Sequence, residues 1–200
     1  MSLFIVFEGI DGSGKSTQVA LLAEKLTSLS KPFIIIREPG GTPLGESIRK
    51  ELKTNDQLSP ITQLLLFSAC RSELLKEVIL PKLNEGLIVI CDRYTYSTLA
   101  YQGYAEGIDI DTIKTVIQLS TDGFEPDIVL FLDTPVETAR SRKGDNNPDH
   151  FDKKDLDFYT RTRDGYITVA MDKTNWNTID GTEQPRMIAN NIWKKIEPLI

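Results

Sequence analysis

The fold of this chain is decided by the stretch Gly9-Ile10-Asp11-Gly12-Ser13-Gly14-Lys15-Ser16. It fits the pattern G-x-x-x-x-G-K-[ST], in which glycines let consecutive backbone N–H groups curl around a phosphate. An apolar run at residues 3–7 precedes it, and residues 17–26 after it have the pattern of an amphipathic helix. A helix that starts at such a loop points its positive end at the same anion. Residues 9–17, Thr17 included, are therefore predicted to hold a triphosphate at a strand-to-helix turn.

Two side chains of the loop have chemical roles in this interpretation. Lys15 can reach the outer phosphates, and Ser16 can offer its hydroxyl to Mg²⁺. The alternative is a glycine-rich turn that only caps a helix, and the strand before the loop and the helix after it make that the weaker interpretation. The loop predicts a bound triphosphate and leaves the reaction open.

Length and composition favour a single domain over residues 1–200. Of the 200 residues, 40% are hydrophobic, which is enough for a substantial core. A formal net charge of −6 and a pI of about 4.9 argue against a nucleic-acid-binding protein, whose surface would be basic. No signal peptide and no membrane-spanning apolar stretch are visible, so we expect a cytoplasmic protein without a membrane partner. Cys70 and Cys91 are expected to be buried, reduced thiols.

Five short apolar runs predict the strands of a parallel sheet. Each is rich in Ile, Val and Phe and lacks strict alternation, which is typical of strands buried on both faces. Helical stretches separate the runs, so the predicted class is α/β with crossover connections. Strands are expected at residues 3–7, 33–37, 87–91, 128–133 and 176–179, and further helices at about 60–83, 109–120, 152–172, 184–196 and after Pro135.

Charged side chains follow several of these strands. Ligands of open α/β sheets bind beyond the carboxyl ends of the strands. Arg37 follows the second predicted strand, and Asp92 and Arg93 follow the third. Two arginines at strand ends near a phosphate loop are suited to clamp anionic groups, whereas one exposed arginine is usually a solvated charge.

Six pieces of the chain resemble those of the thymidylate kinases of bacterial type. They are FEGIDGSGKST at 7–17, REPGGT at 37–42, FSACR at 67–71, DRY at 92–94, AYQG at 100–103 and RTRDGY at 161–166. The resemblance spans nearly the whole chain. It implies a three-layer P-loop nucleoside-monophosphate kinase fold with a five-stranded parallel sheet, transfer of the γ-phosphate of ATP to dTMP, Mg²⁺, and usually a homodimer.

The resemblance also implies a dTMP site. Phe67 and Arg71 lie one helical turn apart, so a ring can stack on the base while a guanidinium donates to a carbonyl such as thymine O4. Core packing and a surface charge are the alternatives. A ring at Tyr101 would exclude a ribose 2′ hydroxyl, unless it is simply core. The implied dTMP-binding set is Asp11, Arg37, Phe67, Arg71, Arg93, Ser97, Tyr101 and Gln102.

Catalysis is expected to rest on positioning and charge, because the dTMP phosphate is itself the nucleophile. Lys15 and Arg93 would hold the phosphates, and Asp11 would contact the sugar 3′ hydroxyl or a metal-bound water, unless it only complements the helix dipole. The metal is expected at Ser16 and Asp92, with Asp133 as the rival of Asp92. Glu8 is interpreted as structural.

The polar residues 141–157 are expected to form a lid, the alternative being an ordinary solvated loop. Some family members carry an arginine where this chain has Gly12, and members without it need a cation from the lid. Arg140, Arg142 and Lys143 lie at the start of this stretch. Arg142 is the expected catalytic cation, and Arg140 is expected to cover the adenine of ATP. His150 stands where bacterial lids often carry arginine, and is either a needed cation or a solvated residue.

Other functions remain open from the sequence. The chain could phosphorylate another acceptor such as dUMP. A GTPase switch should carry an Asn-Lys-x-Asp run, which is missing here. Lys15 and Arg93 both argue against a non-catalytic nucleotide-binding module.

Overall fold

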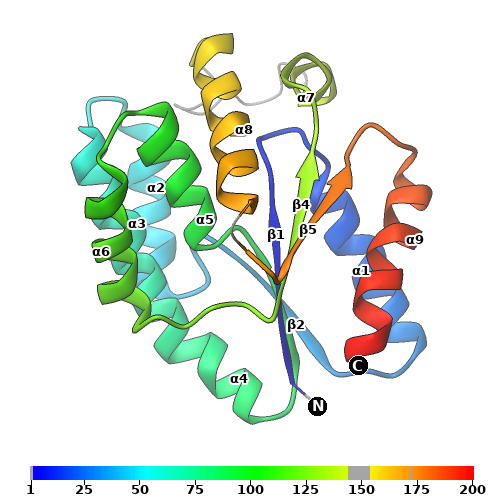
Figure 1. Ribbon diagram of the computed structural model, residues 1–200. Helices are drawn as coiled ribbons and strands as arrows, with labels where there is room; N and C mark the ends of the chain where they lie inside the picture. Colours follow the sequence, from blue (N-terminus) through cyan, green and yellow to red (C-terminus); the bar gives the residue numbers. More distant parts are fainter. Residues whose placement is uncertain (1, 144–153, 172) are drawn as a thin grey trace.

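The computed structural model describes residues 2–143, 154–171 and 173–200. Its centre is a five-stranded parallel sheet, as the sequence predicted (Figure 1). The strands lie in the order β2-β3-β1-β4-β5. The sequence predicted both ends of every strand to within one residue. The strands are β1 (Leu3–Glu8), β2 (Phe33–Arg37), β3 (Ile88–Asp92), β4 (Ile128–Asp133) and β5 (Trp176–Asp180).

The central strand β1 is buried on both faces because successive side chains point to opposite sides of the sheet. Leu3, Ile5 and Phe7 pack into the core on one face. Phe4 and Val6 pack into the core on the other. This explains why the strand reads as a continuous apolar run, and it predicts helices on both sides.

One face of the sheet is covered by α1 (Lys15–Ser28) and α9 (Pro185–Ile196), which lie side by side in Figure 1. Their apolar side chains, among them Leu22, Leu26, Ile188 and Ile192, join the core on that face. A short 3₁₀ turn, Glu197–Leu199, follows α9. Because α1 starts at the phosphate loop, its packing against β1 fixes the direction in which the loop faces.

The other face carries a larger helical layer (Figure 1). Its helices are α3 (Pro60–Leu74), α4 (Leu80–Asn84), α5 (Thr95–Thr98), α6 (Ile110–Thr121) and α8 (Leu156–Ala170), joined by π-helical turns at Leu75–Ile79 and Leu99–Ala105. The predicted helix at 60–83 is confirmed in extent, but the π-helical turn interrupts its α-helical hydrogen bonding.

A further helix, α2 (Pro43–Thr54), was missed by the sequence analysis. Its start has a clear signal: the Thr42 side chain accepts a hydrogen bond from the Gly45 backbone N–H, and Pro43 occupies the first helical turn. α7 (Val136–Lys143) follows β4 and leads to residues 144–153, which lie outside the described part of the chain. Most of the predicted lid and His150 fall there.

Within residues 2–143, 154–171 and 173–200, none of the helices combines the length and the apolar character that crossing a bilayer requires.

Candidate active site

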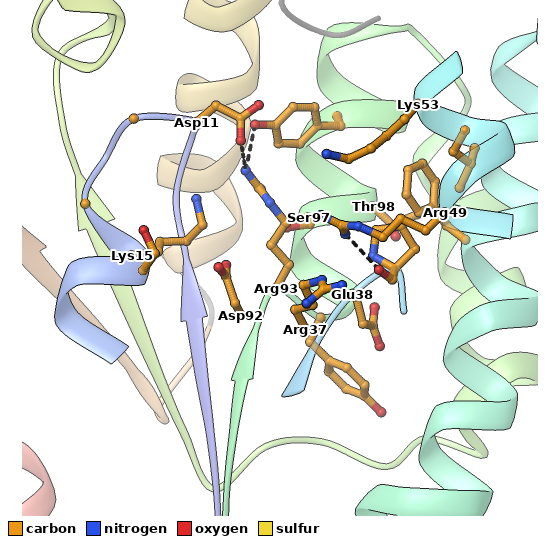
Figure 2. A pocket seen from close by; sticks show the side chains of 18 of the residues that line it. Asp11, Lys15, Arg37, Glu38, Arg49, Lys53, Asp92, Arg93, Ser97 and Thr98 are labelled. Carbon is orange, nitrogen blue, oxygen red and sulfur yellow. Dashed lines mark hydrogen bonds and ion pairs between the residues drawn. The ribbon is translucent and has the colours of Figure 1, made fainter. Parts of the chain in front are cut away.

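A cleft of about 770 Å³ opens at the carboxyl ends of the strands (Figure 2). It brings together the phosphate loop, the residues after β2 and β3, and side chains of α2, α3 and the π-helical turn at Leu99–Ala105. Most of the predicted site residues line it: Asp11, Gly12, Gly14, Lys15, Ser16, Thr17, Arg37, Phe67, Arg71, Asp92, Arg93, Ser97, Tyr101, Gln102 and Arg142. The predicted Arg140 is exposed and is not among the residues that line the cleft.

The phosphate loop has the backbone that its glycines allow. Gly9, Gly12 and Gly14 all have positive φ, with values of 142°, 80° and 100°. The Lys15 ammonium donates to the carbonyl oxygens of Gly9 and Ile10, at 2.9 and 3.0 Å. Burial, followed by the nearby charge of Arg93, lowers the pKa of Lys15 to about 8.

Gly12 lies directly against the backbone of α7. A Cβ at this position would lie 2.1 Å from the carbonyl oxygen of Ala139. The start of the predicted lid is therefore held close to the loop, and Lys143 Nζ lies 3.5 Å from Asp11 Oδ2. Arg142 Nη1 donates to the carbonyl oxygen of Gly181 at 2.6 Å. A residue with any side chain at position 12 would not fit this arrangement.

Arg93 has an unusual backbone and a heavily bonded side chain. Its φ is 74°, in the left-handed region that only a few non-glycine residues adopt. Nη2 donates to Asp11 Oδ1 at 2.8 Å and to the Tyr101 hydroxyl at 3.2 Å, as Figure 2 marks for Asp11. Burial would raise the pKa of Asp11, but the charges of Arg93, Lys15 and Lys143 outweigh it and hold that pKa well below its ordinary value.

Glu8 holds the surroundings of Arg93 in place through hydrogen bonds. Its carboxylate is fully buried and accepts from the backbone N–H groups of Tyr94 and Ser97, at 2.9 and 3.2 Å. The Ser97 and Tyr166 hydroxyls donate to the same carboxylate at 2.6 and 2.9 Å, and both hydroxyls accept from Arg93 Nη1 at 3.1 Å. Glu8 therefore has a structural role in this site: its carboxylate holds the turn that follows Arg93.

Arg71 is buried and paired. Its Nε donates to Glu38 Oε2 at 2.8 Å, and the two side chains are 2% and 5% exposed. Burial raises the pKa of Glu38, against the effect of Arg71. The alternative of a surface charge at position 71 is thereby excluded. Phe67 and Gln102 line the same cleft, whereas Arg37 stands at its edge, 53% exposed and paired with Glu46 at 3.1 Å.

The two candidate metal carboxylates differ sharply. Asp133 is held by Arg163, whose Nε and Nη2 donate to it at 2.6 and 3.0 Å. Asp92 lines the cleft, and its buried Oδ1 has no hydrogen-bond partner among the residues that the structure describes. Among the described residues, no three His, Cys, Asp or Glu side chains gather in a metal-binding group. Ser16 and Asp92 fit a hard cation that takes most of its ligands from phosphate oxygens and water.

Several residues of the cleft were not predicted. Glu38 and Thr98 contact Arg71, and Arg49 and Lys53 of the missed helix α2 line the cleft. Glu38 had the same signal as Asp92 and Arg93, a charged residue at the end of an apolar strand. Arg49 and Lys53 required α2 itself to be predicted.

Three features define the class of this protein: the order of the parallel strands, the phosphate loop, and the arginines Arg37, Arg71 and Arg93 that line the same cleft. They are those of a P-loop nucleoside-monophosphate kinase, a phosphotransferase. The family model "Thymidylate kinase" matches residues 7–192. A thymidylate kinase from Dehalococcoides mccartyi is 48% identical over 203 aligned positions, covering 100% of this chain and 98% of that protein. Those from Kosmotoga olearia and Thermomicrobium roseum are 44% and 42% identical, covering 96% and 98% of this chain and 94% and 95% of their own lengths. The chain belongs to the thymidylate kinase family.

Proposed function

We propose that this chain, acting as one domain, transfers the γ-phosphate of ATP to dTMP and releases dTDP and ADP. The observation that carries the proposal is the position of Arg93. It lines one cleft with Lys15, Phe67 and Arg71. Its side chain bonds to Asp11 of the phosphate loop, and the carbonyl oxygen of the next residue, Tyr94, accepts from Arg71 of α3. A residue between a triphosphate loop and a base-binding wall can hold the phosphate that passes between them.

The donor would lie on the loop. The backbone N–H groups and Lys15 would bind the β- and γ-phosphates, and the Lys15 ammonium would exchange its present carbonyl partners for phosphate oxygens. Because Lys15 is desolvated, its charge acts strongly on a bound anion. Arg142, Lys143 and Arg140 stand near the end of α7, where they can supply the further charge and cover the adenine.

The acceptor would lie between α3 and Arg93. Phe67 would stack on the base and Arg71 would donate to its O4, with Ser97, Tyr101 and Gln102 beside the sugar and base. Arg93 and Arg37 would hold the acceptor phosphate, and Asp11 would face the 3′ hydroxyl. The reaction needs no general base, because the acceptor phosphate is largely ionised near neutral pH.

Ser16 and Asp92 would hold Mg²⁺, which supplies charge neutralisation for the phosphates when it is bound. The unpaired Oδ1 of Asp92 supports this assignment over Asp133.

A homodimer in the cytoplasm is the expected state of the protein. Ile61 and Leu65 of α3 and Leu119 of α6 are exposed apolar side chains on two helices that pack against each other. A second copy would cover them, and light scattering coupled to gel filtration would give its mass.

The decisive experiment measures ADP release from ATP and Mg²⁺ with dTMP, dUMP, dCMP, AMP or thymidine as the acceptor. We expect release with dTMP and much less with dCMP or AMP. Lys15→Ala should lose most of the activity. Absence of dTMP-dependent ADP release would overturn the proposal.

A further inference from the structure

We infer that Glu38 is the positioning residue that sets base selectivity. It fixes the direction of Arg71, so that the Nη1 donors of this arginine are aimed at the base edge and favour 4-keto over 4-amino pyrimidine nucleotides. This inference rests on the proposed function.

The hydrogen bonds of Arg71 leave a single nitrogen for a ligand. A guanidinium has five N–H donors. Nε donates to Glu38 Oε2 at 2.8 Å, and Nη2 donates to the Thr98 hydroxyl at 2.9 Å and to the Tyr94 carbonyl oxygen at 3.2 Å. These contacts use three donors. The remaining two belong to Nη1, which is buried and has no partner in the described part of the chain.

A buried, unpaired Nη1 determines which ligand group fits. Arg71 lines the cleft, but its side chain is only 2% exposed, so bulk water reaches this nitrogen poorly. A carbonyl oxygen can accept from one of its N–H groups. An exocyclic amino group would place its own N–H donors against them and leave all of them unpaired, which is strongly unfavourable in a buried site.

The direction of Nη1 depends on Glu38. The Glu38 side chain, labelled in Figure 2, is itself buried. The backbone N–H of Glu38 donates to the Asp92 carbonyl oxygen at 3.0 Å, so this residue is held at the end of the sheet. It supplies the charged partner of Arg71 on the Nε side. Without it, only the Nη2 contacts with Thr98 and Tyr94 hold the guanidinium, so Nη1 is aimed less well at an oxygen of the base.

The test compares wild-type protein with Glu38→Gln, using kcat/KM for dTMP and for dCMP. Because glutamine replaces the charged hydrogen bond to Arg71 Nε with a weaker neutral one, we expect the dTMP-to-dCMP preference to fall about tenfold or more. Glu85→Gln is the matched control, since Glu85 is an exposed carboxylate that pairs with Lys82 at the surface. It should keep the wild-type preference. A Glu38→Gln preference within about twofold of the wild type would overturn the inference.

A second comparison asks whether Glu38 acts through Arg71. In an Arg71→Met background, adding Glu38→Gln should leave the preference unchanged, because the group that Glu38 positions is gone. An equal effect in both backgrounds would place Glu38 in direct contact with the base and would overturn a positioning role.

If Glu38→Gln does not fold, Thr98→Val tests whether the hydrogen bonds that hold Arg71 set the base preference. It removes an acceptor from Nη2 while keeping the side-chain shape, and should lower the same preference. An unchanged preference in a folded Thr98→Val protein would count against the inference. A wild-type protein without dTMP-dependent activity would instead refute the proposed function, so the two failures are distinguishable.

Discussion

Gly12→Ala is predicted to slow phosphoryl transfer by separating the phosphate loop from α7. The new Cβ would lie 2.1 Å from the Ala139 carbonyl oxygen. Close carbon–oxygen contacts are at roughly 3.3 Å, so the two backbones must move apart by about 1.2 Å. Arg142 and Lys143 follow Ala139 by three and four residues in the same helix, and they would move away from the loop with it.

Two effects of this substitution have different sizes. A non-glycine residue at φ 80° costs about 1–2 kcal/mol, which lowers the Tm of a chain of this length by roughly 2–8 °C. A displacement of about 1 Å in the catalytic groups costs on the order of a hundredfold in rate, equivalent to about 2.7 kcal/mol of transition-state stabilisation. We therefore expect kcat to fall about a hundredfold.

Gly86→Ala separates the two effects. Gly86 has a φ of 85°, close to that of Gly12, and a Cβ there would meet no atom of the described chain within 4 Å. It should lower Tm by a similar amount and leave kcat unchanged. The assay is ADP formation at saturating ATP and dTMP, with thermal unfolding measured on the same samples. If Gly12→Ala keeps the kcat of Gly86→Ala, the argument from close packing is wrong.

Two further predictions concern the loop and the metal. Because the pKa of Lys15 is lowered to about 8 and a bound polyanion favours its charged form, ATP binding at pH 8 should take up about half a proton. ATP affinity should then fall as pH rises above 8. Calorimetry in buffers of different ionisation enthalpy would show the uptake, and its persistence in Lys15→Met would refute the assignment. Asp92→Asn should raise the Mg²⁺ concentration needed for half-maximal rate by about tenfold or more, whereas Asp133→Asn should lower Tm, by breaking the pair with Arg163, and leave the Mg²⁺ requirement unchanged. The opposite pattern in a Mg²⁺ titration would exchange the roles of the two carboxylates.

The sheet was predictable because its signals are local. The inner strands β1, β3 and β4 are short apolar runs buried on both faces, and the outer strands β2 and β5 keep apolar residues within the run although they are partly exposed. The π-helical turn at Leu75–Ile79 left no such signal, since the chain on both sides of it is equally helical. The helix α2 had a capping threonine and a proline at its start, but its buried side is short, with only Gly45 and Leu52 buried.

Most of the predicted site residues line the cleft, but the hydrogen-bonded pairs that they form were not predicted. Position after a strand predicted that Arg37, Asp92 and Arg93 would meet at one edge, because parallel strands share that edge. The choice between Asp92 and Asp133 depended on Arg163, which lies thirty residues beyond Asp133 on another helix. Glu38 came to light only once Arg71 proved to be buried.

The cations of the cleft divide into fixed and adjustable groups. Arg93 is fixed: its left-handed backbone is strained, and such strain persists only where the surroundings determine it, here through Glu8 and the bonds to Ser97 and Tyr166. Arg37 is adjustable, since it is half exposed and its partner Glu46 is exposed as well. Under the proposed function, an acceptor phosphate would meet a preorganised arginine at Arg93, while Arg37 could follow the phosphate as it binds.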